Sequence, residues 1–453
     1  MDFSILTGQW ILVIGSSLVL LLLSPTAKTV QSFFQAATEQ GKAPNFWLLT
    51  SSLVISWIFA KSITVAADLG AAFGIVGGVA YAAYYLSFCV AGMVIYQLRK
   101  QGGFESIHQF LAQKHGKSAL WLFSMLLGIR LFNEVWSNTM VIGSYFGPTG
   151  SSQCYLAILV FTGLTLLYSL KGGMRSSMFT DALQMVLFGA LLAIILSQLI
   201  PNTTGGVSSY LQEGTWSMAT GVNLLLVALL QAFSYPFHDP VMTDRGFVAP
   251  PQTTLKSFLW AGVIGGICII LFSWVGIYAR FHGLEGSAPV AVSKSLSIPM
   301  LLIMNFIMIT SASSTLDSTF SSFSKLATID LGNTQHITVQ KGRLTMAILA
   351  LLGLLPIFLN PEILSATTVS GTMVIGLAPV FICWKWKVPS YSFHLSVGMG
   401  LLTGIILLVG CPDYLLFFEG KYGDLLSLNL LGSIACFLVF LGPLLFSSKQ
   451  PAV

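Results

Sequence analysis

Charged residues are scarce in this sequence. Asp, Glu, Lys and Arg make up 8% of its 453 residues, whereas hydrophobic residues make up 55%, and the mean hydropathy is +0.82. Soluble domains carry about 25% charged residues, so a soluble globular domain is excluded as the body of the chain. The composition indicates a protein that crosses a lipid bilayer many times.

Other signals are missing as well. The six cysteines form no C-x-x-C pair, which argues against structural disulfides and metal clusters. The sequence has no nucleophile–base pair and no phosphate-binding loop, so we expect neither enzyme activity nor a cofactor. The net charge of +5 does not indicate nucleic-acid binding, because in a membrane protein the placement of Lys and Arg matters. Residues 10–23 lack a preceding basic residue and a following cleavage site, so we expect a retained helix and not a signal peptide.

The apolar runs predict an all-α polytopic membrane protein. A membrane span needs about 20 apolar residues, and thirteen segments meet this need. The predicted spans are residues 8–24, 45–70, 74–98, 118–147, 152–170, 178–200, 219–243, 256–281, 298–324, 343–360, 362–384, 391–410 and 424–447.

The positive charges support this count and orient the chain. Of the 21 Lys and Arg residues, Lys61 and Arg130 lie within spans, three lie in connections on one side, and sixteen lie on the other side. Cytoplasmic segments carry the excess of positive charge. We therefore expect a protein of the cytoplasmic (inner) membrane with its N-terminus outside and its C-terminus inside.

The most polar stretch within a span is residues 310–324, which read TSASSTLDSTFSSFS. At about 100° per residue, Ser311, Ser314 and Thr315 share one helix face, with Asp317 beside it. Hydroxyls and a carboxylate at membrane depth must face protein or water. Two interpretations remain open here: close helix packing through small residues, or an oxygen-lined site for a hard cation.

Two further spans carry features that are costly in a membrane. Lys61 lies in the middle of the second span, and Asp239 lies between Pro236 and Pro240 in the seventh. The prolines must interrupt the helix, and broken helices at membrane depth line a site or a cavity. In the fourth span, Arg130 and Glu134 are spaced to pair along one helix.

The two unusual spans are five spans apart. This spacing is what an inverted repeat of five plus five helices would give, with a binding site where the broken helices meet. We therefore predict one transmembrane domain over residues 1–453. Its parts are a peripheral helix at 8–24, a first repeat at 45–200, a second inverted repeat at 219–384, and two peripheral helices within 391–447.

Several motifs together resemble the sodium–solute symporter family, which includes sodium–proline, sodium–galactose and urea transporters. Residues 171–184, KGGMRSSMFTDALQ, match the family's Gly-Gly…Thr-Asp…Gln signature at its sixth helix. The segments 103–116, 239–245 and 314–330 resemble the stretch after the third helix, the end of the seventh, and the ninth-helix motif. The resemblance covers nearly the whole chain.

The resemblance implies the LeuT-type fold, and it implies a sodium site between the second and ninth helices. Carried over by position, Ser314 and Thr315 supply side-chain oxygens, and Ser311, Ile55 and Ile58 supply backbone carbonyls. Asp181 would lie on the path by which the ion leaves to the cytoplasm. An alternative for Asp181 is a carboxylate at a helix N-terminus, where the helix dipole favours it.

Lys61 departs from the family pattern, because matching positions usually carry neutral or acidic residues. It could pair with Asp239 or Asp68, it could anchor a substrate carboxylate, or it could titrate and replace sodium coupling by proton coupling. The substrate candidates are Lys61 and Ser62 on the second span, Tyr81 or Tyr84 on the third, and Tyr235, Phe237 and Asp239 on the seventh.

The resemblance thus implies sodium-coupled symport of a small polar organic solute by alternating access. The expected partners are the solute, the sodium ion and the lipid bilayer, with no nucleic acid. The alternatives are a proton-coupled or sodium-independent carrier that uses Lys61, and a transporter-like sensor. A sensor would be expected to carry an appended signalling domain, whereas this sequence stops at Val453, soon after the last span.

Overall fold

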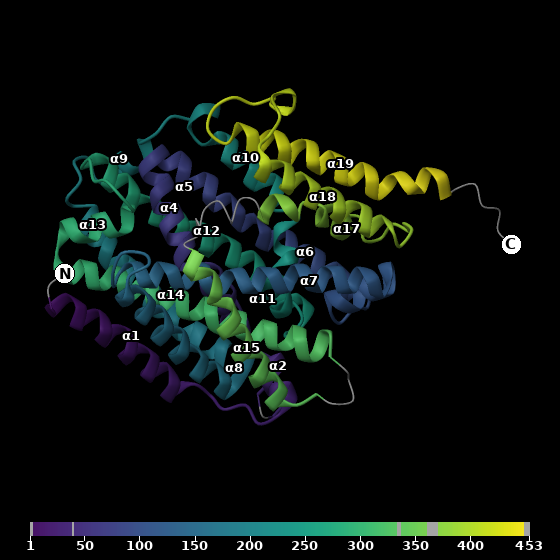
Figure 1. Ribbon diagram of the computed structural model, residues 1–453, viewed down its shortest axis with the longest axis horizontal. Helices are drawn as coiled ribbons and strands as arrows, with labels where there is room; N and C mark the ends of the chain where they lie inside the picture. The colour runs from purple at the N-terminus through teal and green to yellow at the C-terminus, as the bar shows by residue number, and fades with distance from the viewer. Residues whose placement is uncertain (1–2, 39, 333–336, 360–369, 448–453) are drawn as a thin grey trace.

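The computed structural model describes residues 3–38, 40–332, 337–359 and 370–447, and these form helices and connecting loops without strands (Figure 1). Nine of the described helices are long and apolar enough to cross a membrane, and a bent pair makes a tenth candidate. The eleventh predicted span, 362–384, lies partly outside the described residues. The count of thirteen spans therefore stays a prediction.

The second predicted span is a broken helix. α3 (Phe46–Trp57) and α4 (Ala60–Phe73) meet at a 61° bend. At the break, Ile58 has a non-helical backbone (φ −82°, ψ 73°) and Phe59 is extended. The carbonyls of the last turn of α3 therefore lack partners in a continuing helix. They are available to other groups at the depth of the break.

The seventh predicted span is broken as well. It consists of α10 (Val222–Gln231), the short 3-10 helix η3 (Tyr235–His238) and α11 (Pro240–Arg245). Pro236 and Pro240 stand at the starts of η3 and α11, where proline is tolerated because the missing N–H is not needed. The carboxylate of Asp239 caps α11 by accepting a hydrogen bond from the N–H of Met242 (3.2 Å).

The fifth and sixth predicted spans form one continuous element, α8 (Ser152–Leu199), which turns sharply at Gly173. Gly173 has φ 56°, and the hydroxyl of Ser176 reaches the carbonyl of Tyr168 (3.3 Å) across the turn. A Cβ at Gly173 would lie 2.4 Å from the carbonyl oxygen of Phe33. Only glycine fits this turn, because both its φ and its surroundings exclude a side chain.

The remaining helices complete the bundle. They are α1 (Phe3–Leu23), α2 (Val30–Gln35), α5 (Ile75–Ala82), α6 (Leu86–Lys100), α7 (Ile107–Ser144, kinked at Gly116), α9 (Val207–Gln212), α12 (Pro251–Phe281), α13 (Ala288–Leu296), α14 (Ile298–Lys325), α15 (Val339–Gly353), α17 (Leu377–Ile382), α18 (Ser392–Val409) and α19 (Gly423–Ser447).

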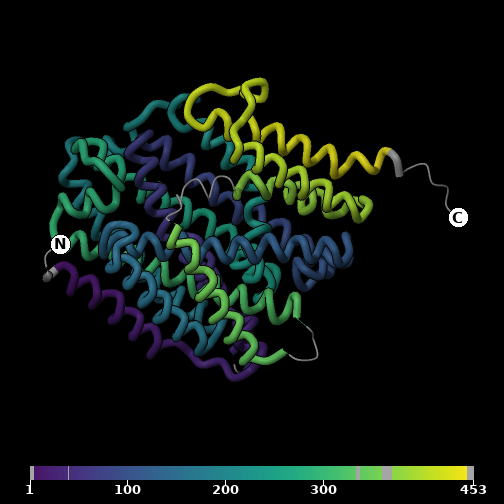
Figure 2. Tube along the Cα trace, viewed as in Figure 1, coloured from purple at the N-terminus to yellow at the C-terminus, as the bar shows by residue number. Residues whose placement is uncertain are grey.

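The arrangement places α14 in the interior. It contacts α8, α7, α3 and α15, while α1 lies along the outside of α8 and α14 (Figure 2). α12 packs against α4 closely enough that a Cβ at Gly276 would lie 1.6 Å from the carbonyl oxygen of Ala67. α18 and α19 run side by side at the yellow end of the chain. The two breaks and the polar half of α14 thus lie inside the bundle.

Candidate functional site

The polar half of α14 faces the break between α3 and α4. The hydroxyl of Ser311 donates a hydrogen bond to the carbonyl of Ile58, at the break. The hydroxyl of Thr315 donates to the carbonyl of Ser311 (3.0 Å), and that of Ser314 donates to Asp181. These three side chains and Ile58 are buried, as is Ile55 one turn earlier on α3. The structure therefore brings Ile58 and Ser311, from opposite halves of the chain, into direct contact.

Residues of the motif at 171–184 form hydrogen bonds with the same helix, α14. Gln184 donates to the hydroxyl of Ser313 (2.6 Å), and the hydroxyl of Tyr168 donates to the carbonyl of Ser313 (3.1 Å). Thr180 and Ser177 donate to the two carboxylate oxygens of Asp317 (2.9 and 2.8 Å). α8 thus supplies hydrogen bonds along one side of α14, which satisfies its polar groups away from water.

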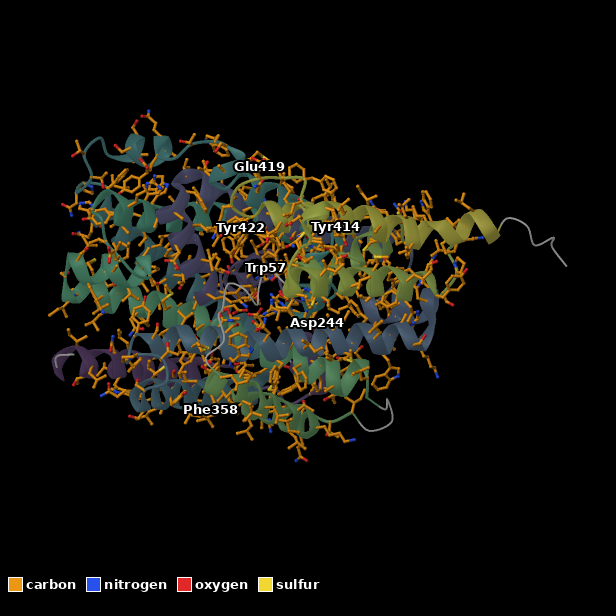
Figure 3. The ribbon with its side chains drawn as sticks, turned by 45° about the horizontal axis from the view of Figure 1, so that its top comes forward. Trp57, Asp244, Phe358, Tyr414, Glu419 and Tyr422 are labelled. Atoms are coloured by element: carbon orange, nitrogen blue, oxygen red, sulfur yellow. The ribbon has the colours of Figure 1, made fainter. Side chains whose placement is uncertain are left out.

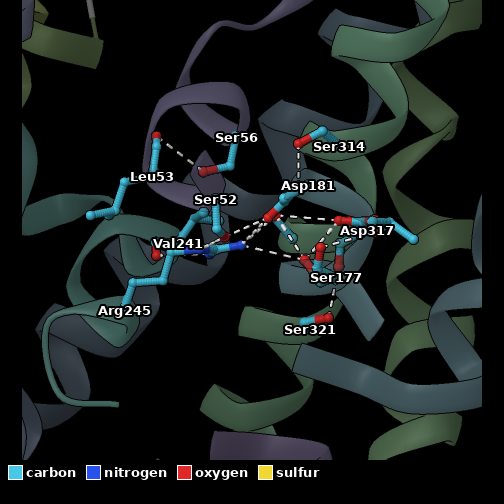
Figure 4. A network of polar contacts seen from close by, with 12 residues as sticks. Ser52, Leu53, Ser56, Ser177, Asp181, Val241, Arg245, Ser314, Asp317 and Ser321 are labelled. Atoms are coloured by element: carbon cyan, nitrogen blue, oxygen red, sulfur yellow. Dashed lines mark hydrogen bonds and ion pairs between the residues drawn. The ribbon is translucent and has the colours of Figure 1, made fainter. Parts of the chain in front are cut away.

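Asp181 lies at the centre of a buried network that joins α8 to three other helices (Figure 4). Its Oδ2 accepts hydrogen bonds from Ser52 on α3 (2.5 Å) and from Arg245 on α11 (3.0 Å), and its Oδ1 accepts from Ser314. Asp181 and Asp317 are fully buried, and Arg245 is 1% exposed. With all three groups ionised, two carboxylates and one guanidinium sum to a formal charge of −1, which favours a cation nearby.

The donor set at this place suits a hard cation. Among the described residues, no group of three His, Cys, Asp or Glu side chains could hold a metal ion. Ser311, Ser314, Thr315 and Ile58 instead offer hydroxyl and carbonyl oxygens, which are the ligands that hard cations prefer. The sodium-ligand assignment for these residues and Ile55 stays a prediction, and the geometry that favours it is the contact between α14 and the break.

A second buried network surrounds Lys61. Its ammonium pairs with the Glu134 carboxylate (2.8 and 2.9 Å) and donates to Ser137 (3.2 Å). Of the three alternatives for Lys61, the pairing with Asp239 or Asp68 is therefore not the one that the structure shows. The cause is the position of α7, which places Glu134 beside α4, whereas Asp68 accepts from the backbone N–H of Ala288 (2.9 Å).

Glu134 also binds Arg130, as its spacing predicts. The two side chains are 2.5 Å apart, and Arg130 reaches on to Asp239 (3.3 Å). The indole N–H of Trp57 donates to the same Asp239 oxygen (2.7 Å). Two cations and two carboxylates thus form a neutral network that connects α4, α7 and the break before α11.

A small cavity of about 40 Å³ lies between the two broken helices and α5. Of the substrate candidates, Lys61, Ser62, Tyr81, Tyr84 and Tyr235 line it. Phe237 and Asp239 are not among its lining residues. Phe237 stacks on Phe381 with ring centroids 4.0 Å apart, and Asp239 is held by Arg130 and Trp57. Trp57 and Tyr422 line the cavity as well. Figure 3 shows Trp57 inside the bundle.

A much larger cavity, of about 830 Å³, lies at the side where α7 begins and α14 ends. Lys325 lines this cavity and forms ion pairs with Asp244 (2.7 Å) and Asp330 (3.0 Å), which also line it. His108 approaches Asp330 at 3.6 Å. These contacts join α11, α14 and the start of α7 at the edge of the bundle.

Sequence reasoning missed several members of these networks. Ser52 and Ser177 bridge the charged groups, Gln231 binds the hydroxyl of Tyr84 (3.0 Å), and Trp57 holds Asp239. Ser52 lies one turn before Ile55 and Ser56 on a membrane helix. A hydroxyl so close to the break was the signal that could have identified it.

Comparison with solved structures shows a shared fold. A sodium-coupled sialic acid symporter, in a substrate-bound outward-open state, superposes with a TM-score of 0.72 at 15% identity, covering 98% of this chain and 99% of that chain. A nucleobase–cation-symport-1 family transporter, closed with bromovinylhydantoin bound, gives a TM-score of 0.58 at 13% identity, covering 93% and 96%. The expected LeuT-type fold is confirmed.

Sequence comparison points in the same direction. Sodium/glucose cotransporter 1 of Mus musculus is 24% identical over 290 residues, which are 60% of this chain and 40% of the mouse protein. The chain spans about 40% of the length of this protein and of the sodium/glucose cotransporter 1 proteins of Ovis aries and Oryctolagus cuniculus, which it also matches. No protein-family profile matches the chain. The resemblance to sodium–solute symporters that the motifs indicate is confirmed.

Proposed function

We propose that this protein is a secondary active transporter that couples the inward movement of sodium to uptake of a small polar organic solute. The observation that carries the proposal is the contact of Ser311 with the Ile58 carbonyl, beside the bond of Ser314 to Asp181. The contact supports the proposal because it brings a hydroxyl of α14 next to a backbone carbonyl at the break between α3 and α4. The fold shared with sodium-coupled symporters supports the same function.

In this proposal sodium holds α14 against the α3 break. The hydroxyl of Ser314 turns from Asp181 toward the ion, and the hydroxyl of Thr315 turns from the Ser311 carbonyl toward it. The backbone carbonyls of Ile55, Ile58 and Ser311 complete the set of ligands. The charge of −1 around Asp181 stabilises the bound cation. Asp181 then offers the next oxygen site on the way to the cytoplasm.

Sodium and solute binding are coupled because one broken span, formed by α3 and α4, contributes residues to both the sodium site and the solute site. α3 ends at Trp57, and Ile58 follows at the break. Phe59, Lys61 and Ser62, just beyond the break, line the small cavity. An ion that fixes the break therefore also fixes one wall of the solute site. Because coupling free energy is reciprocal, bound solute tightens sodium binding by the same factor.

The two broken helices support the division into inverted repeats, 45–200 and 219–384. Each is the first span of its half, and the third span of each half follows a short helical segment, 107–115 before the kink in α7 and α13 before α14. Rocking of the two sets of helices around the central site is the usual route of alternating access in such folds. We propose an inner-membrane location with the N-terminus outside.

The test is sodium-dependent binding to the purified full-length chain. Thermal unfolding is measured in NaCl and in KCl for the wild type, for Ser314→Ala/Thr315→Ala, and for Ser321→Ala. Ser321 is a matched control, since it is buried on the same helix but donates only to the carbonyl of Asp317 (2.8 Å). We expect sodium to raise the midpoint of the wild type and of Ser321→Ala, and to leave the double variant unchanged.

A sodium effect that survives in the double variant would place the ion elsewhere. A stabilisation that ignores sodium but follows pH, and that Lys61→Met removes, would instead favour the proton-coupled alternative.

A further inference from the structure

The wall of the small cavity is mainly aromatic. Seven of its thirteen lining residues are Trp, Phe or Tyr, including Trp57, Tyr84, Tyr85 and Tyr235. Neighbouring rings are in contact, with centroids of Trp57 and Tyr85 5.4 Å apart and those of Tyr84 and Tyr235 6.0 Å apart. A solute in this cavity therefore faces π systems on several sides.

The polar groups of the wall are largely engaged with protein. Tyr81 donates to Ser62 (3.1 Å), Tyr84 donates to Gln231 (3.0 Å), and Tyr85 donates to the carbonyl of Trp57 (2.9 Å). A polyhydroxylated solute needs many free donors and acceptors, because each of its unpaired hydroxyls would pay a desolvation cost. The wall is thus poorly suited to a sugar.

Two of the lining rings already contact cationic side chains. The ammonium of Lys61 lies 5.1 Å from the centroid of Phe59, and the guanidinium of Arg130 lies 5.2 Å from that of Tyr235. Cations within about 6 Å of a ring centroid are attracted by its electron-rich face, and quaternary ammonium groups are recognised by aromatic cages in this way. The same chemistry can receive a cationic group inside the cavity.

The charge balance limits the solute further. Lys61, Arg130, Glu134 and Asp239 sum to zero, and all four are at most 3% exposed. Under the proposed function, sodium neutralises the charge of −1 in the other network. A net charge on the solute would then have no buried partner, which is costly at this depth. The solute should therefore carry no net charge.

We infer that the solute is a small zwitterion whose cationic end is a methylated ammonium group in the aromatic cavity and whose anionic end shares the ammonium of Lys61. Lys61 is the one charged residue among the described residues that line the cavity. About 10–15 Å³ of such volume holds one water, so about 40 Å³ suits a compact headgroup. This inference rests on the proposed function.

The experiment compares matched ligands on the purified full-length protein in NaCl and in KCl. The probes are trimethylammonium carboxylates with one, two or three carbons between nitrogen and carboxylate, and the analogues in which carbon replaces nitrogen. Choline and glucose complete the set. Dissociation constants are measured by calorimetry. Cation–π attraction corresponds to roughly a 5- to 30-fold change in affinity, so one zwitterion should bind at least about fivefold tighter than its carbon analogue.

Variants separate the ring from the hydroxyl at one position. Tyr84→Leu should weaken binding of that zwitterion about tenfold, whereas Tyr84→Phe should stay within about threefold of the wild type. Tyr414→Leu is the control, since Tyr414 is 79% exposed outside the cavity. Lys61→Met should remove the preference for the zwitterion over choline.

The two proposals fail in different ways. If sodium stabilises the wild type but not Ser314→Ala/Thr315→Ala, and no zwitterion binds tighter than its carbon analogue or glucose binds best, the solute inference is overturned and the proposed function stands. If sodium has no effect, the proposed function fails, and the comparison in KCl still decides the inference. Equal losses in Tyr84→Leu and Tyr84→Phe would also overturn it.

Discussion

Replacing Arg245 by methionine should destabilise the protein more than neutralising the aspartate that it binds. Arg245 is 1% exposed and is the partner of Asp181, which is fully buried, as is Asp317. Arg245→Met changes the formal charge of this network from −1 to −2, whereas Asp181→Asn changes it to zero. The two substitutions break the same ion pair but shift the formal charge of the network in opposite directions.

The magnitudes follow from burial. Removing one partner of a buried ion pair costs about 3–5 kcal/mol, because the remaining charge is uncompensated. Asp181→Asn leaves Asp317 to balance Arg245, so its cost is set by lost hydrogen bonds, about 1–3 kcal/mol. In the double variant one carboxylate remains, and contacting residues couple by about 0.5–3 kcal/mol, so its loss should be smaller than the sum of the single losses.

The assay is the midpoint of thermal unfolding in detergent, read by size-exclusion chromatography of heated samples in NaCl and in KCl. We expect midpoints in the order wild type, Asp181→Asn, Arg245→Met, and a larger sodium effect in Arg245→Met because its network is more negative. Equal midpoints for the two single variants, or a double variant that loses more than their sum, would refute the reasoning.

Three further predictions concern other parts of the chain. Gly173→Ala should abolish the folded fraction measured by size-exclusion chromatography, because φ 56° and the Phe33 carbonyl exclude a Cβ. Gly163→Ala on the same helix should be tolerated, since a Cβ there would have no atom within 4 Å. Equal folded yields of the two variants would contradict this reasoning. Thr243 lines the larger cavity. Lys325→Met should raise maleimide labelling of a cysteine placed at Thr243 severalfold, because the ion pairs with Asp244 and Asp330 are lost. Lys341→Met, at an exposed position, should leave the labelling unchanged. A fluorescent protein fused to the C-terminus should fluoresce inside the cell, and phosphatase fused at residue 285 should be active outside; the reverse result would invert the topology.

The sequence determined much of this protein by local rules. Apolar runs mark the long helices, and the two prolines beside Asp239 mark a broken span, because each of these features acts on its own segment. The Ser/Thr-rich stretch on α14 and the motif at 171–184 indicated where the polar interior lies. The pairing of Arg130 with Glu134 followed from helical spacing alone.

Tertiary structure decided which groups from different helices meet. Lys61 forms its ion pair with Glu134 and not with Asp239 or Asp68, because the placement of α7 beside α4 depends on how all helices pack. Likewise, only folding brings Ser52, Arg245 and Ser314 to one carboxylate, and only folding turns scattered tyrosines into a cavity wall. Periodicity reports the face on which a side chain lies, whereas the identity of its partner is set by contacts between residues far apart in the chain.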